Sequence, residues 1–172
     1  MISLFWAAEL PEDIGSLVEM MNNSGKRMNK RNVVTFSADF SDDSQWGEQG
    51  IEIVPGGQAI TQAIKSQLQQ QGISCSDIAQ HDTYGWAFNA ELDKSRIQVL
   101  LAAAEGGWLV QLVPRQSVIG LLLGRPEAAG LETVRRNLHD TLAEDKRFFD
   151  IKWHTKADYD SCNESAASDS PY

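Results

Sequence analysis

The chain has 172 residues, 42% of them hydrophobic, and its 24 acidic against 15 basic side chains give a net charge of −9. That is enough apolar material for one folded domain without disulfides or metal. The negative field disfavours nucleic acid and anionic lipid as partners. The apolar runs are too short for a membrane-spanning helix, and two distant cysteines, Cys75 and Cys162, do not form a disulfide framework.

Residues 1–27 are expected to form a helical extension. Pro11 and the acids after it suit a helix start, and four apolar residues then recur at helical spacing: Ile14, Leu17, Val18 and Met21. The first residues lack the basic stretch of a signal peptide, so we expect the protein to stay in the cytoplasm. Met28 is an alternative start, which would make residues 1–27 optional.

The next segment predicts a strand, a loop and a helix. Residues 33–40 alternate between apolar and polar side chains, as in a half-buried strand, and a polar acidic loop covers residues 41–50. After a short strand over 51–54, Pro55-Gly56-Gly57 breaks the chain before a helix over 58–71. We interpret the glycines as a turn that needs positive φ, with an anion site as the alternative.

Three hairpin-linked strands are expected over residues 84–92, 96–104 and 108–113, followed by a helix over 128–145. Residues 117–123 are apolar and ambiguous between strand and helix. Phe148–His154 is the last predicted strand, with Phe149, Ile151 and Trp153 on its inner face. Trp86, Trp108 and Trp153 are all expected in the core.

Together these elements predict an α+β fold. We expect one domain over residues 28–156, with a two-layer, mostly antiparallel sheet in the order strand, helix, three strands, helix, strand. The helices should pack on one face, in addition to the helix in the extension over 1–27. Residues 157–172 are acidic and poor in apolar side chains, which predicts a disordered tail.

No catalytic, cofactor-binding or metal-binding residue is predicted. His81, His139 and His154 lack a second ligand at suitable spacing. There is no G-x-S-x-G motif, and Cys75 follows a predicted helix C-terminus, whose negative dipole disfavours a thiolate. The protein is therefore expected not to be an enzyme and to need no cofactor.

Two surfaces are candidates for contact with a partner. The first is the acidic loop, where an aromatic residue lies among carboxylates: Asp42, Asp43, Trp46 and Glu48. A solvated loop without a partner is the plainer alternative. The second is the outward face of the predicted meander, which is partly apolar at Leu100, Leu109 and Val113. Such a patch is normally covered, by the N-terminal residues, a second copy or another protein.

The expected function is that of a small acidic intracellular protein that binds another protein, with a basic partner favoured. Small inhibitors of toxins and chaperones of secreted proteins are similar in size, charge and α+β make-up. This similarity is one of type, because no family motif occurs in the chain. The alternatives are an enzyme whose site is not visible in one sequence, and a structural subunit that forms a homodimer through the apolar sheet face.

Overall fold

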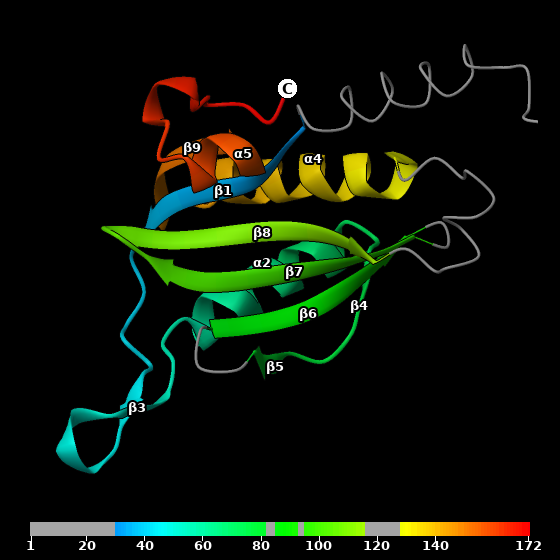
Figure 1. Ribbon diagram of the computed structural model, residues 1–172. Coiled ribbons are helices and arrows are strands. Elements are labelled where there is room, and N and C mark those ends of the chain that lie inside the picture. Colours follow the sequence, from blue (N-terminus) through cyan, green and yellow to red (C-terminus); the bar gives the residue numbers. More distant parts are fainter. Residues whose placement is uncertain (1–29, 82–84, 93–94, 116–127) are drawn as a thin grey trace, which may run out of the picture.

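A computed structural model of the chain describes residues 30–81, 85–92, 95–115 and 128–172 (Figure 1). The helical extension expected over 1–27 and the ambiguous segment 117–123 lie outside these residues. The described strands and α-helices are, in chain order, β1 (Arg31–Ala38), β2 (Gln45–Trp46), β3 (Glu52–Val54), α2 (Gln58–Gln70), β4 (Ser74–Cys75), β5 (Ala79–His81), β6 (Gly85–Leu92), β7 (Ser95–Ala104), β8 (Gly107–Arg115), α4 (Ala128–Glu144), β9 (Phe148–Thr155) and α5 (Lys156–Asp160). Two 3₁₀ turns, η1 (Glu48–Gly50) and η2 (Glu164–Ala166), complete the set.

The main sheet has the strand order β4-β6-β7-β8-β1-β9, and β5 also pairs with β6. All of its pairs are antiparallel. The prediction of an α+β fold built on an antiparallel sheet is therefore confirmed. The short strand expected over 51–54 is present as β3, and it pairs with β2 in a separate hairpin. The structure adds β2, β4 and β5, which the hydrophobic pattern does not predict because each has only two or three residues.

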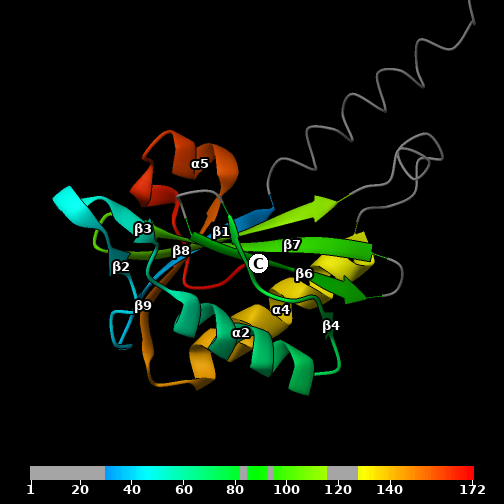
Figure 2. The same cartoon turned by 90° about the horizontal axis from the view of Figure 1, so that it is seen from below.

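The core lies between the sheet and the helices α2 and α4, which pack on the same face (Figure 2). Alternation along the strands turns the same set of side chains toward these helices, as the cross-strand pairs Phe88–Val99, Leu101–Val110 and Trp86–Leu101 show. Both helices contribute fully buried stripes, which are Ile60, Ile64 and Leu68 from α2 and Leu131, Val134, Leu138 and Leu142 from α4. We call the opposite side of the sheet the outer face.

In strand β9, the side chains that face the core differ in part from those predicted. Its pairing with β1 shifts register between Thr35 and Ser37, and Asp150 has a φ of 55°. This bulge changes which side chains face the core at the start of the strand. Phe148 is buried against Phe36, with ring centroids 5.4 Å apart, whereas Phe149 is 48% exposed. Phe149 is therefore not an inner-face residue, although Trp153 is fully buried as predicted.

The C-terminal segment (residues 156–172) also differs from the prediction, because it lies against the sheet instead of forming a disordered tail. Helix α5 contacts β1 and β9, on the side of the sheet away from α2 and α4 (Figure 2). Further along, Ser168 and Trp153 exchange two backbone hydrogen bonds at the edge of β9. The segment is held largely by polar contacts and long-range pairing, which a count of apolar residues does not detect. No described helix is long and apolar enough to cross a membrane.

Candidate functional site

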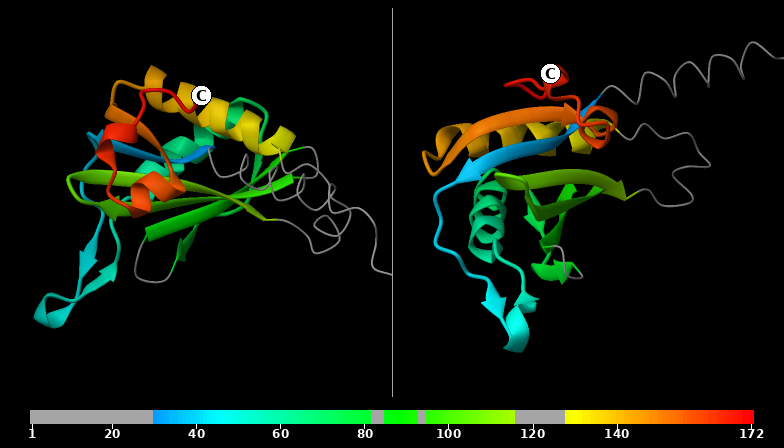
Figure 3. Two further views of the ribbon diagram at one scale, coloured as in Figure 1. Left: turned by 45° about the horizontal axis from the view of Figure 1, so that its top comes forward. Right: turned by 60° about the vertical axis from the view of Figure 1, so that its left-hand side comes forward.

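The acidic loop forms a projecting hairpin, which we call the β2–β3 arm (residues 45–54). It extends away from the sheet and the helices (Figures 1 and 3). Three large apolar side chains on it are exposed to solvent: Trp46 by 62%, Ile51 by 63% and Ile53 by 61%. Such a concentration of exposed apolar side chains on one short hairpin is typical of an interaction site.

Both faces of the arm carry apolar side chains. Trp46 lies directly opposite Glu52 in the β2–β3 ladder, so these two side chains share one face. Ile53 is the extra residue at a bulge in this ladder, and it lies beside Gly47, where an added Cβ would be 2.5 Å from Ile53 Cδ1. Because Gly47 follows Trp46 in extended backbone, Ile53 lies on the face opposite to the Trp46 side chain. The indole nitrogen of Trp46 donates a hydrogen bond of 2.9 Å to Ser44 Oγ, which ties the ring to the base of the arm.

Of the predicted acidic contact residues, Asp43 is engaged inside the chain. Its two carboxylate oxygens accept hydrogen bonds from the backbone N–H groups of Gly57 (2.5 Å) and Ala59 (2.6 Å). Asp43 therefore pairs with backbone N–H groups at the start of α2 that have no partner within the helix, as an N-terminal cap does. The glycine loop is the expected turn, since Gly57 has a φ of 92°. The chain's own carboxylate lies where the alternative interpretation places an external anion.

Asp42 and Glu48 remain on the surface. Asp42 is exposed, and a hydrogen bond from the backbone N–H of Ser44 lowers the pKa of its carboxyl group. Glu48 and Glu52 are exposed, and neither forms an ion pair among the described residues. The arm thus presents apolar side chains among unneutralised carboxylates.

The second predicted surface lies on the outer face of β7 and β8. Leu109 pairs with Ala102, Leu100 with Gln111 and Val113 with Gln98, so the three apolar candidates share this face. Each of them is half-buried. The structure therefore places Leu100, Leu109 and Val113 together, on a different element from the arm.

A pocket that the sequence pattern does not indicate lies between the outer face and the C-terminal segment. Its volume is about 640 Å³. Thr35 from β1 and Lys152 and His154 from β9 form one wall, and residues between Asp158 and Ala167 form another. We call it the outer-face pocket. The only sequence signal for it is the pair of outward polar residues, Thr35 and His154, on strands that otherwise belong to the core.

His154 is the most enclosed polar residue of this pocket, with 7% of its surface exposed. Its Nε2 lies 3.0 Å from Thr35 Oγ1, and its ring makes an edge-to-face contact with Tyr159 at 5.8 Å between centroids. Burial lowers the pKa of His154, and this effect exceeds the attraction of Asp158 and Glu164, which act in the opposite direction. The imidazole is therefore neutral at physiological pH.

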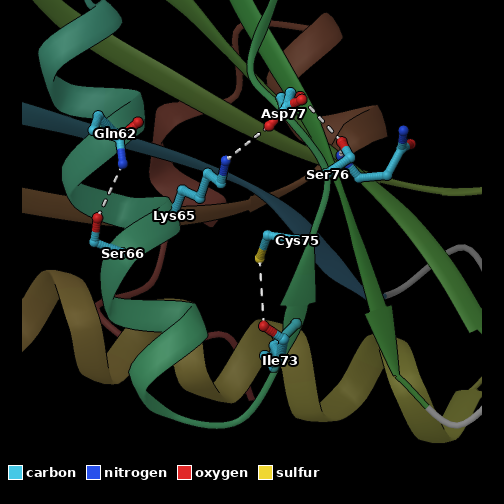
Figure 4. A network of polar contacts seen from close by, with 8 residues as sticks. Gln62, Lys65, Ser66, Ile73, Cys75, Ser76 and Asp77 are labelled. Atoms are coloured by element: carbon cyan, nitrogen blue, oxygen red, sulfur yellow. Dashed lines mark hydrogen bonds and ion pairs between the residues drawn. The ribbon is translucent and has the colours of Figure 1, made fainter.

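The other histidines and the half-buried cysteine are dispersed. His139 Nδ1 accepts a hydrogen bond from the Trp153 indole at 3.2 Å, which is a packing role. Cys75 lies beside α2, with its thiol 3.7 Å from the Ile73 carbonyl oxygen (Figure 4), and burial raises the pKa of that thiol. Within the described residues, no group of three or more His, Cys, Asp or Glu side chains is placed to hold a metal ion.

Comparison with known proteins finds no matching family model, no matching curated protein and no matching solved structure.

Proposed function

We propose that the protein binds another protein by inserting the β2–β3 arm into an apolar groove with a basic rim. The observation that carries this proposal is the exposure of Trp46, Ile51 and Ile53 on a projecting hairpin. Because the apolar side chains point to both faces, a groove buries more of them than a flat surface does. Inhibition of a basic toxin and protection of a secreted protein are two roles that require such binding.

The charges of the arm favour a basic rim. Asp42, Glu48 and Glu52 are exposed around the apolar side chains, and the whole chain has a net charge of −9. Exposed carboxylates of this kind accelerate encounter with a basic surface more than they strengthen the final complex. Trp46, in contrast, is a large aromatic side chain whose ring is held in place by the hydrogen bond to Ser44, and such residues are often hot spots of an interface.

The proposal is tested by photo-cross-linking from the arm. A photoreactive phenylalanine derivative replaces Trp46 in one full-length variant and Phe149 in a control, since Phe149 is an exposed aromatic residue on β9. We expect a specific cross-linked protein from position 46 in native cells and none from position 149. Equal cross-linking from both positions would contradict the arm as the binding element.

Binding kinetics then separate the two roles within the arm. Trp46→Ala should raise the off-rate of the captured partner about 30-fold or more, the usual effect of losing a hot spot worth about 2 kcal/mol. Glu48→Gln/Glu52→Gln should mainly lower the on-rate and reduce its dependence on salt. An unchanged affinity after all of these substitutions would exclude the arm.

A further inference from the structure

The orientation of the β2–β3 arm is decided at its base, which consists of residues 39–44 before the arm and residues 55–57 after it. Above the base, the arm extends away from the sheet and the helices (Figure 3). Gln80 Nε2 donates a hydrogen bond to the Ile53 carbonyl oxygen, but at 3.4 Å this bond is long. Burial does not hold the arm either, because its large apolar side chains are mostly exposed.

The residues that lead into the arm are attached to the start of β9. The Asp39 N–H donates a hydrogen bond of 2.8 Å to the Arg147 carbonyl oxygen. The Phe40 ring lies beside Phe148, with 5.5 Å between centroids, and the guanidinium carbon of Arg147 lies 4.4 Å from the Phe40 ring centre. A cation over an aromatic face is attracted by the ring. The chain is therefore held as far as residue 40.

The residues that lead out of the arm are attached to the core. The indole N–H of Trp86 on β6 donates a hydrogen bond of 2.9 Å to the Pro55 carbonyl oxygen, and this bond is buried. Pro55 and Gly57 are themselves buried. This side of the base is therefore held independently of the side that leads in.

Asp43 joins the two sides of the base. Its Oδ1 accepts from the Gly57 N–H and its Oδ2 from the Ala59 N–H, and hydrogen bonds to a charged acceptor are among the stronger ones. No other side chain of residues 39–44 forms a hydrogen bond across the base in the part of the chain that the structure describes. The two sides also lie close together, since a Cβ added at Gly56 would be 3.4 Å from Asp42 Oδ1.

We propose that Asp43 is a positioning residue, which holds the arm in its projecting orientation before any partner is bound. A two-stranded hairpin alone is only marginally stable, and the Asp43 carboxylate removes the freedom of this hairpin to swing about its base. The inference rests on the proposed function in one respect, because a preformed arm matters only if the arm binds. A partner then meets an ordered arm, and the complex loses less conformational entropy on forming.

The test measures the distance between the arm and the core in the full chain without a partner. Spin labels are attached at Glu48→Cys on the arm and Gln70→Cys at the end of α2, after Cys75→Ala and Cys162→Ser have removed the native thiols. Pulsed electron paramagnetic resonance then reports the distribution of distances. We expect one narrow distribution with Asp43 present. Asp43→Ala should widen it about twofold or more, because the two sides of the base are then no longer joined.

Asp42→Ala is the matched control. It removes the same charge one position earlier, but the Asp42 carboxylate accepts its hydrogen bond from Ser44 on its own side of the base, so the distribution should stay narrow. Asp43→Asn keeps one acceptor oxygen and should give an intermediate width, and this variant decides the question if Asp43→Ala does not fold. A loss of stability in urea with an unchanged distribution would overturn the proposal, because Asp43 would then only cap α2.

Partner binding gives a second measurement. Asp43→Ala should weaken the affinity for the cross-linked partner about tenfold more than Asp42→Ala does, since ordering the free arm adds a cost to binding. Equal weakening would show that charge alone matters and would contradict the positioning role in binding. The distance measurement needs no partner. A narrow, Asp43-dependent distribution without partner capture would refute the proposed function alone, and a captured partner with a distribution insensitive to Asp43 would refute this inference alone.

Discussion

Single residues connect distant parts of this chain, and Gly57 is the clearest case. It is the N-cap residue just before α2, with a φ of 92°, and a Cβ atom there would lie 2.6 Å from side-chain atoms of both Leu101 and Trp108. Its N–H donates to Asp43, 14 residues earlier in the chain. One glycine thus joins the base of the arm, the start of a helix and the core side of the sheet.

Gly57→Ala should lower the free energy of unfolding by about 2–6 kcal/mol, because backbone strain and overpacking each cost about 1–3 kcal/mol. Urea denaturation measures this loss. Gly72→Ala is the matched control: Gly72 has a φ of 86°, but an added Cβ would meet nothing within 4 Å. The control should lose only the strain contribution, about 1 kcal/mol. Equal losses would show that the contact with Leu101 and Trp108 does not matter.

His154 predicts a pH dependence of stability. Its pKa is lowered by burial from an ordinary value of 6.5, so below that pH the unfolded chain takes up a proton before the folded chain does. The free energy of unfolding should therefore fall as the pH decreases from about 6.5 toward the pKa of the folded state. Above that interval, His154 should cause no change of stability with pH. Arg31 adds to the lowering, and Asp158 and Glu164 oppose it.

The measurement compares denaturation of the wild type and His154→Gln at pH 7.5 and pH 5.5. The glutamine amide can still form a hydrogen bond with Thr35 but does not titrate, so the variant should lose less stability over this interval than the wild type. Identical losses in the two proteins would mean that His154 is not the group responsible.

At the scale of elements, the tryptophans separate the core from the arm. Trp86 is 7% exposed on β6 and donates a hydrogen bond of 2.9 Å to the Pro55 carbonyl oxygen, whereas Trp46 on β2 is 62% exposed. The same residue type therefore has a packing role on a central strand and an accessible position on the arm.

Trp86→Ala should destabilise the protein by about 3–5 kcal/mol, the usual cost of emptying an aromatic core site. Trp46→Ala should cost less than about 1 kcal/mol, as exposed substitutions normally do. Urea denaturation of both variants tests the difference. The reverse order would show that the arm supports the fold and that its exposed ring is not free for a partner.

For the whole molecule, the C-terminal segment completes the outer face. It supplies one wall of the outer-face pocket and reaches the sheet edge at Ser168. The Tyr172 carbonyl oxygen accepts a hydrogen bond from Arg31 at 3.1 Å, and Lys152 pairs with Asp169. Val33, on the outer face of β1, is 2% exposed although its side chain points away from the main core.

Truncation after Lys156 should therefore lower stability by about 2 kcal/mol or more, which corresponds to at least about 4 °C in Tm for a protein of this size. Asp169→Asn is the control, since a single exposed ion pair contributes less than about 1 kcal/mol. Calorimetry measures both changes. A truncated protein that melts within 1–2 °C of the full chain would show that the segment does not stabilise the sheet.

The sequence by itself determined the α+β class and most of the core. Periodicity identifies β1, β6, β7, β8, α2 and α4 because each buries one stripe or face, and burial leaves a regular pattern. Trp86 and Trp153 were correctly placed in the core for the same reason. The exposed position of Trp46 also followed from its polar, turn-rich neighbourhood.

Only the tertiary structure decided the remaining features, because each depends on residues far apart in the chain. The bulge in β9 is set by its register with β1, more than 100 positions earlier, and it turns Phe149 outward. Asp43 caps a helix that begins beyond the arm, and Thr35 meets His154 across 119 positions. The C-terminal segment docks through backbone pairing and ion pairs. Composition and periodicity report how much apolar surface a segment buries, and they carry no signal for polar contacts of this range.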